Sequence, residues 1–303
     1  MADEPRASTP ALDRLEARFR AASPVFREAV ARSRGTLGEG WATLFDQALV
    51  WLIPDEKTLA AAVSGYSRFA LEALRLQARF EKDGVYASKS YADVSDNVYA
   101  NDAYMTSCYL PGLLLSNYLW PHHYWQTRYF QEFFVAEMVR RRADRFYDIG
   151  VGTGLYSRLA LVGAPRTRGV GIDISPSSKA FAERHVGAFG AGGRYGVGLR
   201  DIVKRPAPPL DWLICVEVLE HVEDPVEFLR TLRAMLRPGG LAFIGTALNA
   251  ANADHIYLYR TTDEIKAQIE HAGFAVEHAF CAAAGPPRGP SIPVPEVAAF
   301  VVT

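Results

Sequence analysis

Three glycines and an aspartate lie close together in the segment DIGVGTG, residues 148–154. The segment follows the β-rich run RFYD and precedes a helical run that begins near Leu155. Glycines at a strand-to-helix turn allow a tight bend and let a ligand approach the backbone and the helix N-terminus. The spacing of Gly150, Gly152 and Gly154 therefore predicts a loop that binds a nucleotide-like ligand.

Charge and spacing narrow the class of ligand. The dinucleotide fingerprint needs its third glycine one position later, where this chain has Leu155. Asp148 would repel a pyrophosphate but attract an ammonium group. Asp173 ends the next β-rich run, GVGIDI, where a carboxylate can accept hydrogen bonds from ribose hydroxyls. The favoured ligand is a nucleoside with an amino group and no diphosphate, a description that S-adenosylmethionine meets.

Five ordered motifs resemble those of the class I S-adenosylmethionine-dependent methyltransferases. Their sequences are similar to those of the ubiquinone and menaquinone biosynthesis enzymes and of related secondary-metabolite methyltransferases. The motifs are DIGVGTG (148–154), GIDIS (171–175), LRDI (199–202), LICVEVLEHVEDPVEFLRTL (213–232) and LRPGG (236–240). This resemblance implies the fold and the cofactor. It leaves the substrate open, because function belongs to the site that a fold carries rather than to the fold.

The resemblance also implies roles for individual residues. The three glycines would line the methionine and the ribose, Asp148 would orient the amino group, and Asp173 would hold the ribose hydroxyls. Ile174 would flank the adenine, Asp201 would meet its amino group, and the stretch from Cys215 to Glu217 would close the pocket floor. The cofactor-binding set that follows is Asp148, Gly150, Gly152, Gly154, Asp173, Ile174, Asp201, Ile202 and Glu217.

The segment EVLEHV holds two acids and a histidine. If a helical turn starts there, Glu217, Glu220 and His221 share one face, and His255 could supply a fourth ligand for a divalent ion. The alternative is a pocket-wall acid and a helix-capping acid beside a hydrogen-bonded or general-base histidine. We predict the second arrangement, with no bound metal and with His221 as a candidate for proton removal.

Aromatic residues are frequent in the segment 86–134, where their share of the residues far exceeds the 12% of the whole chain. We expect some of them to pack against the sheet, because residues at a spacing of four lie on the same side of a helix. Those residues are Trp125, Tyr129 and Phe133. Others could wall a pocket, where a ring face stabilises a sulfonium by about 0.5–2 kcal/mol. The candidates for this role, in the polar stretch SDNVYANDAYM, are Tyr99, Asn101 and Tyr104, with packing or a dimer contact as the alternative.

The elements that must position these residues differ between the two halves of the chain. Residues 11–141 show helical spacing, whereas from Arg145 onward short β-rich runs alternate with helical stretches. We therefore expect an α/β, Rossmann-like class I methyltransferase fold. It would have a mostly parallel seven-stranded sheet, an antiparallel last strand and an N-terminal all-helical cap. The expected domains are a cap or lid over residues 1–120 and a S-adenosylmethionine-binding domain over residues 121–303.

Length and composition fit a globular protein, with 303 residues of which 49% are hydrophobic and 22% charged. The formal net charge of -1 lacks the basic surplus that binding to nucleic acid or an anionic membrane needs. Residues 1–10 have no apolar signal region, and three widely spaced cysteines suit a reducing cytoplasm. We expect a cytoplasmic protein with a small-molecule substrate, no nucleic acid or membrane partner, and a homodimer as one option.

Three functions fit these patterns. The first is a methyltransferase of secondary metabolism that uses S-adenosylmethionine on a small molecule. The second is a lyase, similar to azetidine-2-carboxylate synthases, in which the amino nitrogen of S-adenosylmethionine attacks its own side chain and expels methylthioadenosine. The third is a non-catalytic protein that only binds the cofactor.

Overall fold

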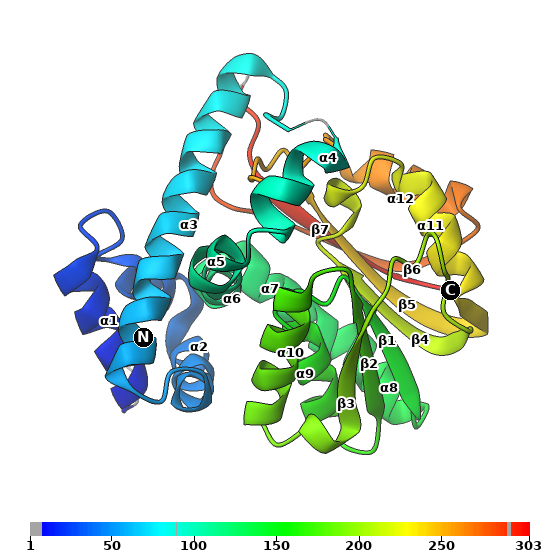
Figure 1. Ribbon diagram of the computed structural model, residues 1–303, viewed down its shortest axis with the longest axis horizontal. Coiled ribbons are helices and arrows are strands. Elements are labelled where there is room, and N and C mark those ends of the chain that lie inside the picture. The colour runs from blue at the N-terminus through cyan, green and yellow to red at the C-terminus, as the bar shows by residue number, and fades with distance from the viewer. Residues whose placement is uncertain (1–7, 89, 290–291) are drawn as a thin grey trace, which may run out of the picture.

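The computed structural model describes residues 8–88, 90–289 and 292–303. These residues include a seven-stranded sheet. The sheet lies to one side of the N-terminal helices (Figure 1). The strand order is β3-β2-β1-β4-β5-β7-β6. Strand β7 runs antiparallel to both of its neighbours, and the other pairs are parallel. The strands are β1 (Arg145–Ile149), β2 (Arg168–Asp173), β3 (Tyr195–Leu199), β4 (Leu210–Val216), β5 (Leu236–Leu248), β6 (Val276–Ala283) and β7 (Glu296–Val302). The predicted fold is confirmed.

The central strands are apolar on both faces, as expected for strands that helices cover on each side. Strands β1 and β4 bury almost all of their side chains. Strand β5 starts earlier than the β-rich run LAFIGT predicts. Leu236 pairs with Leu210 of β4, and the register then shifts across the glycine pair so that Leu241 pairs with Trp212. The prediction missed this start because the proline and glycines of LRPGG form a bulge inside the strand.

Helices cover both faces of the sheet (Figure 1). Helices α11 and α12 pack through Leu229 and Ile265 on one face, and α9 packs through Ala160 on the other. Side-chain caps mark three of the helix starts, because Ser175, Asp224 and Thr261 each accept a hydrogen bond from a backbone N–H of the first turn. These helices are α9 (Leu155–Gly163), α10 (Pro176–Ala188), α11 (Pro225–Ala234) and α12 (Thr262–His271).

The first half of the chain is helical, as predicted, and it includes three π-helical segments. Its elements are α1 (Pro10–Ala22), α2 (Ala29–Leu52), α3 (Glu56–Asp83), α4 (Tyr91–Val94), η1 (Ser95–Tyr99), α5 (Asp102–Tyr104), η2 (Met105–Tyr109), α6 (Leu110–Leu119), α7 (Pro121–Tyr129), η3 (Phe130–Val135) and α8 (Ala136–Arg140). Two short 3₁₀ turns follow among the strands, η4 (Gly192–Arg194) and η5 (Leu219–His221). Within the described residues, no helix has the length and apolar character needed to cross a membrane.

The cap and the sheet share one hydrophobic core. The same buried cluster contains Phe45 of α2, Leu115 of α6, Phe130 of η3 and Phe243 of β5. Within the cap, α3 and α6 approach closely, and a Cβ on Gly112 would lie only 2.3 Å from Cβ of Phe69. The cap is therefore held against the sheet by continuous packing.

Candidate active site

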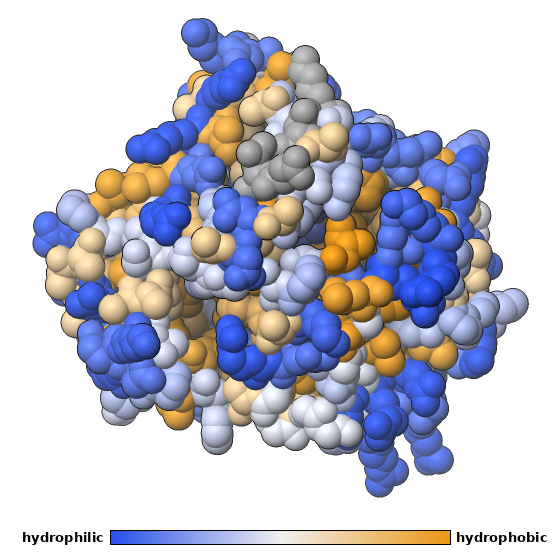
Figure 2. Space-filling view, viewed as in Figure 1, coloured by the Kyte–Doolittle hydropathy of each residue, from blue (hydrophilic) through white to orange (hydrophobic). Residues whose placement is uncertain are grey.

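A cavity of about 960 Å³ lies between the carboxyl ends of the parallel strands and the helical cap. Ligands of open α/β sheets bind at this edge, near the point where the strand order reverses, which in this sheet is between β1 and β4. The cavity wall includes the loop after β1, the ends of β2 and β4, and one face of α3. On the molecular surface, apolar side chains gather between α4 and α11 (Figure 2).

The glycine loop forms a cradle that only glycine can build. Gly150, Gly152 and Gly154 have φ values of 67°, 49° and 73°, which lie in the left-handed region that L residues rarely adopt. A Cβ on Gly150 would lie 2.5 Å from Cγ2 of Val218, and one on Gly154 would lie 2.9 Å from Cβ of Ala182. Gly150 and Gly152 line the cavity, and Gly154 is the N-cap of α9. The loop therefore fits a ligand that approaches the backbone closely.

Asp173 stands at the end of β2 on the cavity wall. Its Oδ2 accepts a hydrogen bond from the Gly152 N–H at 3.1 Å, and its Oδ1 accepts one from the Ser175 N–H at 2.8 Å. Burial raises the pKa of Asp173, and these backbone donors oppose the rise. Because each carboxylate oxygen has two lone pairs, Asp173 retains capacity for two ribose hydroxyls.

Asp148 is buried and does not belong to the cavity wall. Its Oδ2 accepts hydrogen bonds from the Ser157 N–H at 3.1 Å and the Ser157 hydroxyl at 2.7 Å. Burial raises the pKa of Asp148 to about 7. Asp148 therefore ties β1 to α9, and the structure does not bring its carboxyl group onto the cavity surface.

The two residues that the resemblance assigns to the adenine, Ile174 and Asp201, lie on the cavity wall together with Ile202 of the cofactor-binding set. Asp201 is partly exposed, and its Oδ1 accepts hydrogen bonds from the backbone N–H groups of Val203 at 3.0 Å and Lys204 at 3.3 Å. Burial would raise the pKa of Asp201, but these hydrogen bonds and the nearby Lys204 ammonium lower it. Asp201 is therefore an ionised acceptor beside two apolar side chains.

Glu217 follows β4 and combines three unusual properties. Its φ of 55° places a residue other than glycine in the left-handed region. It lines the cavity, and its Oε1 is buried without a hydrogen-bond partner among the described residues. Burial and the neighbouring carboxylate of Glu220 raise the pKa of Glu217 well above its ordinary value.

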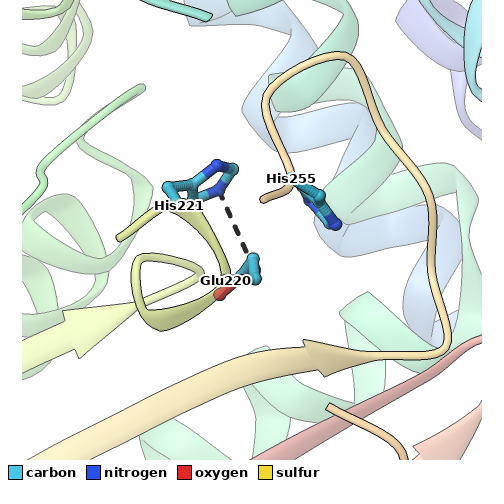
Figure 3. A group of neighbouring side chains, drawn as sticks. All are labelled: Glu220, His221 and His255. Carbon is cyan, nitrogen blue, oxygen red and sulfur yellow. Dashed lines mark ion pairs between the residues drawn. The ribbon is translucent and has the colours of Figure 1, made fainter. Parts of the chain in front are cut away.

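Glu220, His221 and His255 converge beside the cavity (Figure 3), and their possible ligand atoms lie within 4.8 Å of one another. Both oxygens of Glu220 already accept hydrogen bonds, one from the Thr246 hydroxyl at 2.6 Å and one from the Ala247 N–H at 3.3 Å. Glu217 lies outside the short turn η5 that carries Glu220 and His221. Among the described residues, the structure therefore brings together three possible metal ligands rather than the four that the sequence suggested.

His221 is fixed by the loop that follows β5. Its Nδ1 lies 2.9 Å from the carbonyl oxygen of Asp254 and 3.3 Å from that residue's Oδ2. An N–H at Nδ1 that donates to this carbonyl leaves Nε2 as the basic nitrogen. Burial would lower the pKa of His221, but the carboxylates of Asp254 and Glu220 outweigh that effect and raise it. His221 lines the cavity and has the geometry of an oriented proton acceptor.

Asp254 is a buried carboxylate that the sequence analysis missed. Its Oδ2 accepts hydrogen bonds from the hydroxyl groups of Tyr109 at 2.5 Å and Tyr99 at 3.1 Å, both of which line the cavity. Burial would raise the pKa of Asp254, but the nearby His221 and His255 outweigh it and lower the pKa. Asp254 therefore anchors two cap tyrosines to the sheet half of the molecule.

The structure separates the three candidates in the polar stretch. Tyr99 lies on the cavity wall. The side chain of Asn101 instead caps α5 by accepting a hydrogen bond from the Tyr104 N–H at 3.0 Å, and the Tyr104 hydroxyl donates to Oε2 of Glu72 at 2.5 Å. Asn101 and Tyr104 are not part of the cavity wall, so their catalytic role stays a prediction without support from their position.

Two adjacent histidines, His122 and His123, were also missed. Both line the cavity and are buried, and their Nδ1 atoms have no hydrogen-bond partner among the described residues. The indole of Trp120 stacks on His122 with ring centroids 5.9 Å apart and an interplanar angle of 15°. The signal in the sequence was the pair itself, directly after a tryptophan and a proline that starts α7.

Comparison with known proteins supports the interpretation of the sheet. The methyltransferase domain family matches residues 147–242. The ubiquinone biosynthesis O-methyltransferase of Parvibaculum lavamentivorans is 38% identical over 114 residues, which cover 37% of this chain and 44% of that protein. The corresponding protein of Xanthomonas axonopodis pv. citri is 33% identical over 115 residues, 37% of this chain and 47% of that protein. The chain thus spans less than half the length of these curated relatives.

Solved structures extend the likeness in fold to the cap. Mitomycin 7-O-methyltransferase aligns with 96% of this chain and 94% of its own, with a TM-score of 0.53 and 15% identity. Human N-acetylserotonin methyltransferase, solved with S-adenosylmethionine, aligns with 80% of this chain and 69% of its own, with a TM-score of 0.54 and 14% identity. Residues 147–242 of the sheet half therefore match a methyltransferase domain family, and the chain shares the fold of these solved methyltransferases.

Proposed function

We propose that this protein is an S-adenosylmethionine-dependent methyltransferase that acts on a small molecule of secondary metabolism. The observation that carries the proposal is the cavity, in which the glycine cradle and Asp173 line one part, cap side chains line another, and residues after β4 and β5 line a third. Its volume of about 960 Å³ is at the upper end of the range of about 300–1,000 Å³ for small-molecule sites. That volume leaves room for an acceptor beside the cofactor.

In this proposal, some cavity residues bind the cofactor and another accepts a proton. The cofactor supplies an electrophilic methyl group on a sulfonium. Gly150, Gly152 and Asp173 would hold its nucleoside, and Ile174, Asp201 and Ile202 its adenine. His221 would accept the proton of the acceptor at Nε2, because the Asp254 carbonyl orients its other nitrogen. Catalysis would rest mainly on alignment of the reacting atoms in a site from which the cap excludes water.

A second function has support from two observations. The carboxyl group of Asp148, with a pKa of about 7, does not line the cavity and would not hold the amino group of the ligand firmly protonated. Aromatic rings of Tyr91, Tyr99, Tyr109 and Trp120 line the cap side of the cavity. These features also fit the lyase, in which that amino nitrogen attacks the side chain of the same molecule.

One assay separates the functions. The purified protein is incubated with S-adenosylmethionine, first alone and then with a panel of hydroxy and amino acceptors, and the products are identified by mass spectrometry. We expect S-adenosylhomocysteine and a methylated acceptor only in the second incubation. Methylthioadenosine with a cyclic amino acid in the first incubation would establish the lyase and overturn methyl transfer. Binding without any turnover would favour the non-catalytic function.

We also propose that the reaction needs no metal ion. The support is that Glu220 has no solvent exposure and is held by Thr246 and Ala247, and that Glu217 does not join Glu220, His221 and His255. Dialysis of the protein against EDTA should leave the rate of the assay above unchanged. A rate that falls and is restored by a divalent ion would show that Glu220, His221 and His255 bind a metal.

The proposal also covers the compartment, the partners and the assembly of the protein. Cys108, Cys215 and Cys281 are free thiols, which suits the reducing cytoplasm. We propose a small-molecule substrate with no nucleic acid partner, and a homodimer as an assembly that light scattering would test.

A further inference from the structure

The N-terminus of α7 meets the cavity without a side-chain cap. Its N-cap residue Trp120 and the first three residues of the helix, Pro121, His122 and His123, all line the cavity. The N–H groups of the first turn have no acceptor within the helix, and Trp120 offers them no side-chain oxygen. This end of α7 therefore brings backbone donors of His122 and His123 to the cavity wall.

Two buried imidazoles lie at the same place. His122 and His123 are each 7% exposed, and their Nδ1 atoms have no hydrogen-bond partner among the described residues. The two rings are in contact, with centroids 4.4 Å apart. Burial lowers the pKa of both histidines, so each imidazole is neutral and has one donor and one acceptor nitrogen. Because buried polar groups are normally hydrogen-bonded, two unpartnered nitrogens on a cavity wall indicate a ligand.

Several other donors on the cap wall are already used inside the protein. The hydroxyl groups of Tyr99 and Tyr109 both donate to the carboxylate of Asp254. The indole N–H of Trp120 donates to the hydroxyl oxygen of Tyr66 at 2.9 Å. The histidine pair and the first turn of α7 therefore form a polar site on this wall that the protein itself does not fill.

The cap wall carries no ionised side chain. Among the described residues, every Asp, Glu, Lys and Arg that lines the cavity belongs to the sheet half, from Asp173 onward. Much of the cap wall is apolar, including Phe26, Phe69 and Leu113. A carboxylate or an ammonium bound here would lose its hydration without gaining an opposite charge. The wall therefore fits an uncharged, mostly apolar molecule that carries an oxygen function.

The histidine pair also lies near the proposed proton acceptor. His123 is close enough to His255 for that histidine to contribute to its lowered pKa. The ring of His255 contacts that of His221, with centroids 4.9 Å apart. We propose that His122, His123 and the N-terminus of α7 bind a carbonyl or hydroxyl oxygen of an uncharged, mostly apolar acceptor and so hold it near His221. This inference rests on the proposed function, because it names the class of acceptor and the residues that hold it.

The test uses three naphthalene probes that differ in one substituent. 1-Acetylnaphthalene has an uncharged carbonyl group, 1-ethylnaphthalene has no oxygen, and 1-naphthoate has a charged carboxylate. Equilibrium dialysis gives their dissociation constants for the protein saturated with S-adenosylhomocysteine. The wild type is compared with His122→Phe and His123→Phe, which keep an aromatic ring and remove the nitrogens. The control is His271→Phe, which changes an exposed histidine of α12.

We expect the wild type to bind 1-acetylnaphthalene about tenfold or more tightly than either other probe, because only this probe satisfies the buried donors without burying a charge. Each of His122→Phe and His123→Phe should reduce the preference over 1-ethylnaphthalene about fivefold, and the control should keep it. Thermal melting reports folding, and if one variant does not fold, the other variant and the wild type still decide.

Three results would overturn the inference. The first is a wild type without a preference for the carbonyl probe, which includes a wild type that binds none of the three. The second is tighter binding of 1-naphthoate, which would show that the helix N-terminus takes an anion. The third is a preference that both variants retain. Failure of the proposed function is a separate outcome, because it appears as a wild type that does not bind S-adenosylhomocysteine, and the probes can then be compared without it.

Discussion

His122 and His123 face the cavity as uncharged side chains. Burial lowers the pKa of His122 to about 4 and that of His123 well below its ordinary value. A neutral imidazole offers one donor and one acceptor nitrogen, whereas an imidazolium offers two donors and a charge. Beside the indole of Trp120, these two histidines give the cap side of the cavity a polar but neutral surface, which suits an acceptor without charge.

The low pKa of His122 makes stability depend on pH. The unfolded chain binds a proton at this histidine near pH 6.5, and the folded protein binds it only near pH 4. The stability conferred by neutral His122 is therefore complete above pH 6.5 and is lost as the pH falls toward 4. Protonation of His122 should lower the free energy of unfolding by up to about 3 kcal/mol. Urea unfolding at several pH values measures this loss.

The variant His122→Gln should remove that share of the pH dependence. The control is His278→Gln, which changes an exposed histidine of β6 and should leave the slope as it is in the wild type. A slope between pH 6.5 and 4 that is identical in His122→Gln and the wild type would show that His122 does not titrate in this way.

At the residue scale, the sequence predicted several residues that the structure places on the cavity wall beside the glycine loop. Gly150, Gly152 and Asp173 could be found because a short motif fixes both their order and their place at a strand end. Asp254 could not, because it acts through contacts with residues far away in the chain, such as the bond from Tyr109 to Asp254 across 145 positions.

At the scale of elements, strands and sheet helices followed the hydrophobic pattern, while the segment of α7 and η3 departed from it. The predicted face of Trp125, Tyr129 and Phe133 is wrong for Trp125, which is 44% exposed, although Tyr129 stacks on Phe280 of β6 with ring centroids 5.0 Å apart. The π-helical segment η3 starts at Phe130 and interrupts the spacing of four on which that prediction relied.

The crossing of α3 and α6 supplies a test at this scale. Gly112→Ala would force a Cβ against Cβ of Phe69, an atom that cannot move without its backbone, so we expect a loss of at least about 1–3 kcal/mol in the free energy of unfolding. The matched control is Gly35→Ala in α2, where a Cβ meets nothing within 4 Å. That control should gain about 0.5–1 kcal/mol, because alanine favours a helix interior. Equal midpoints of urea unfolding for the two variants would contradict the close crossing.

For the whole molecule, the arrangement of cap and sheet decides how the protein unfolds. The sequence separates residues 1–120 from 121–303 by their patterns, but it does not indicate that the two parts share a core. Phe45 and Phe243 lie far apart in the sequence, and only the structure places them in one buried cluster.

The shared core predicts a single unfolding transition. Calorimetry should give one unfolding peak, and S-adenosylhomocysteine should move the whole peak to a higher temperature. At a ligand concentration one hundred times the dissociation constant, binding raises the free energy of unfolding by about 2.7 kcal/mol. Two peaks, of which only one responds to the ligand, would show instead that the cap and the sheet are independent domains.

The hydrogen bonds from Tyr99 and Tyr109 to Asp254 also bear on how the chain folds during synthesis. Tyr109 leaves the ribosome 145 residues before its partner. At about 5–20 residues per second, the aromatic segment of the cap waits about 7–30 s for the loop that anchors it. Through that interval the hydroxyl groups of Tyr99 and Tyr109 lack the carboxylate that accepts their hydrogen bonds, so we expect the nascent cap to be held less firmly and to expose apolar rings to chaperones. Slowed translation between codons 110 and 254 should therefore reduce the yield of folded protein more than the same delay placed after codon 254.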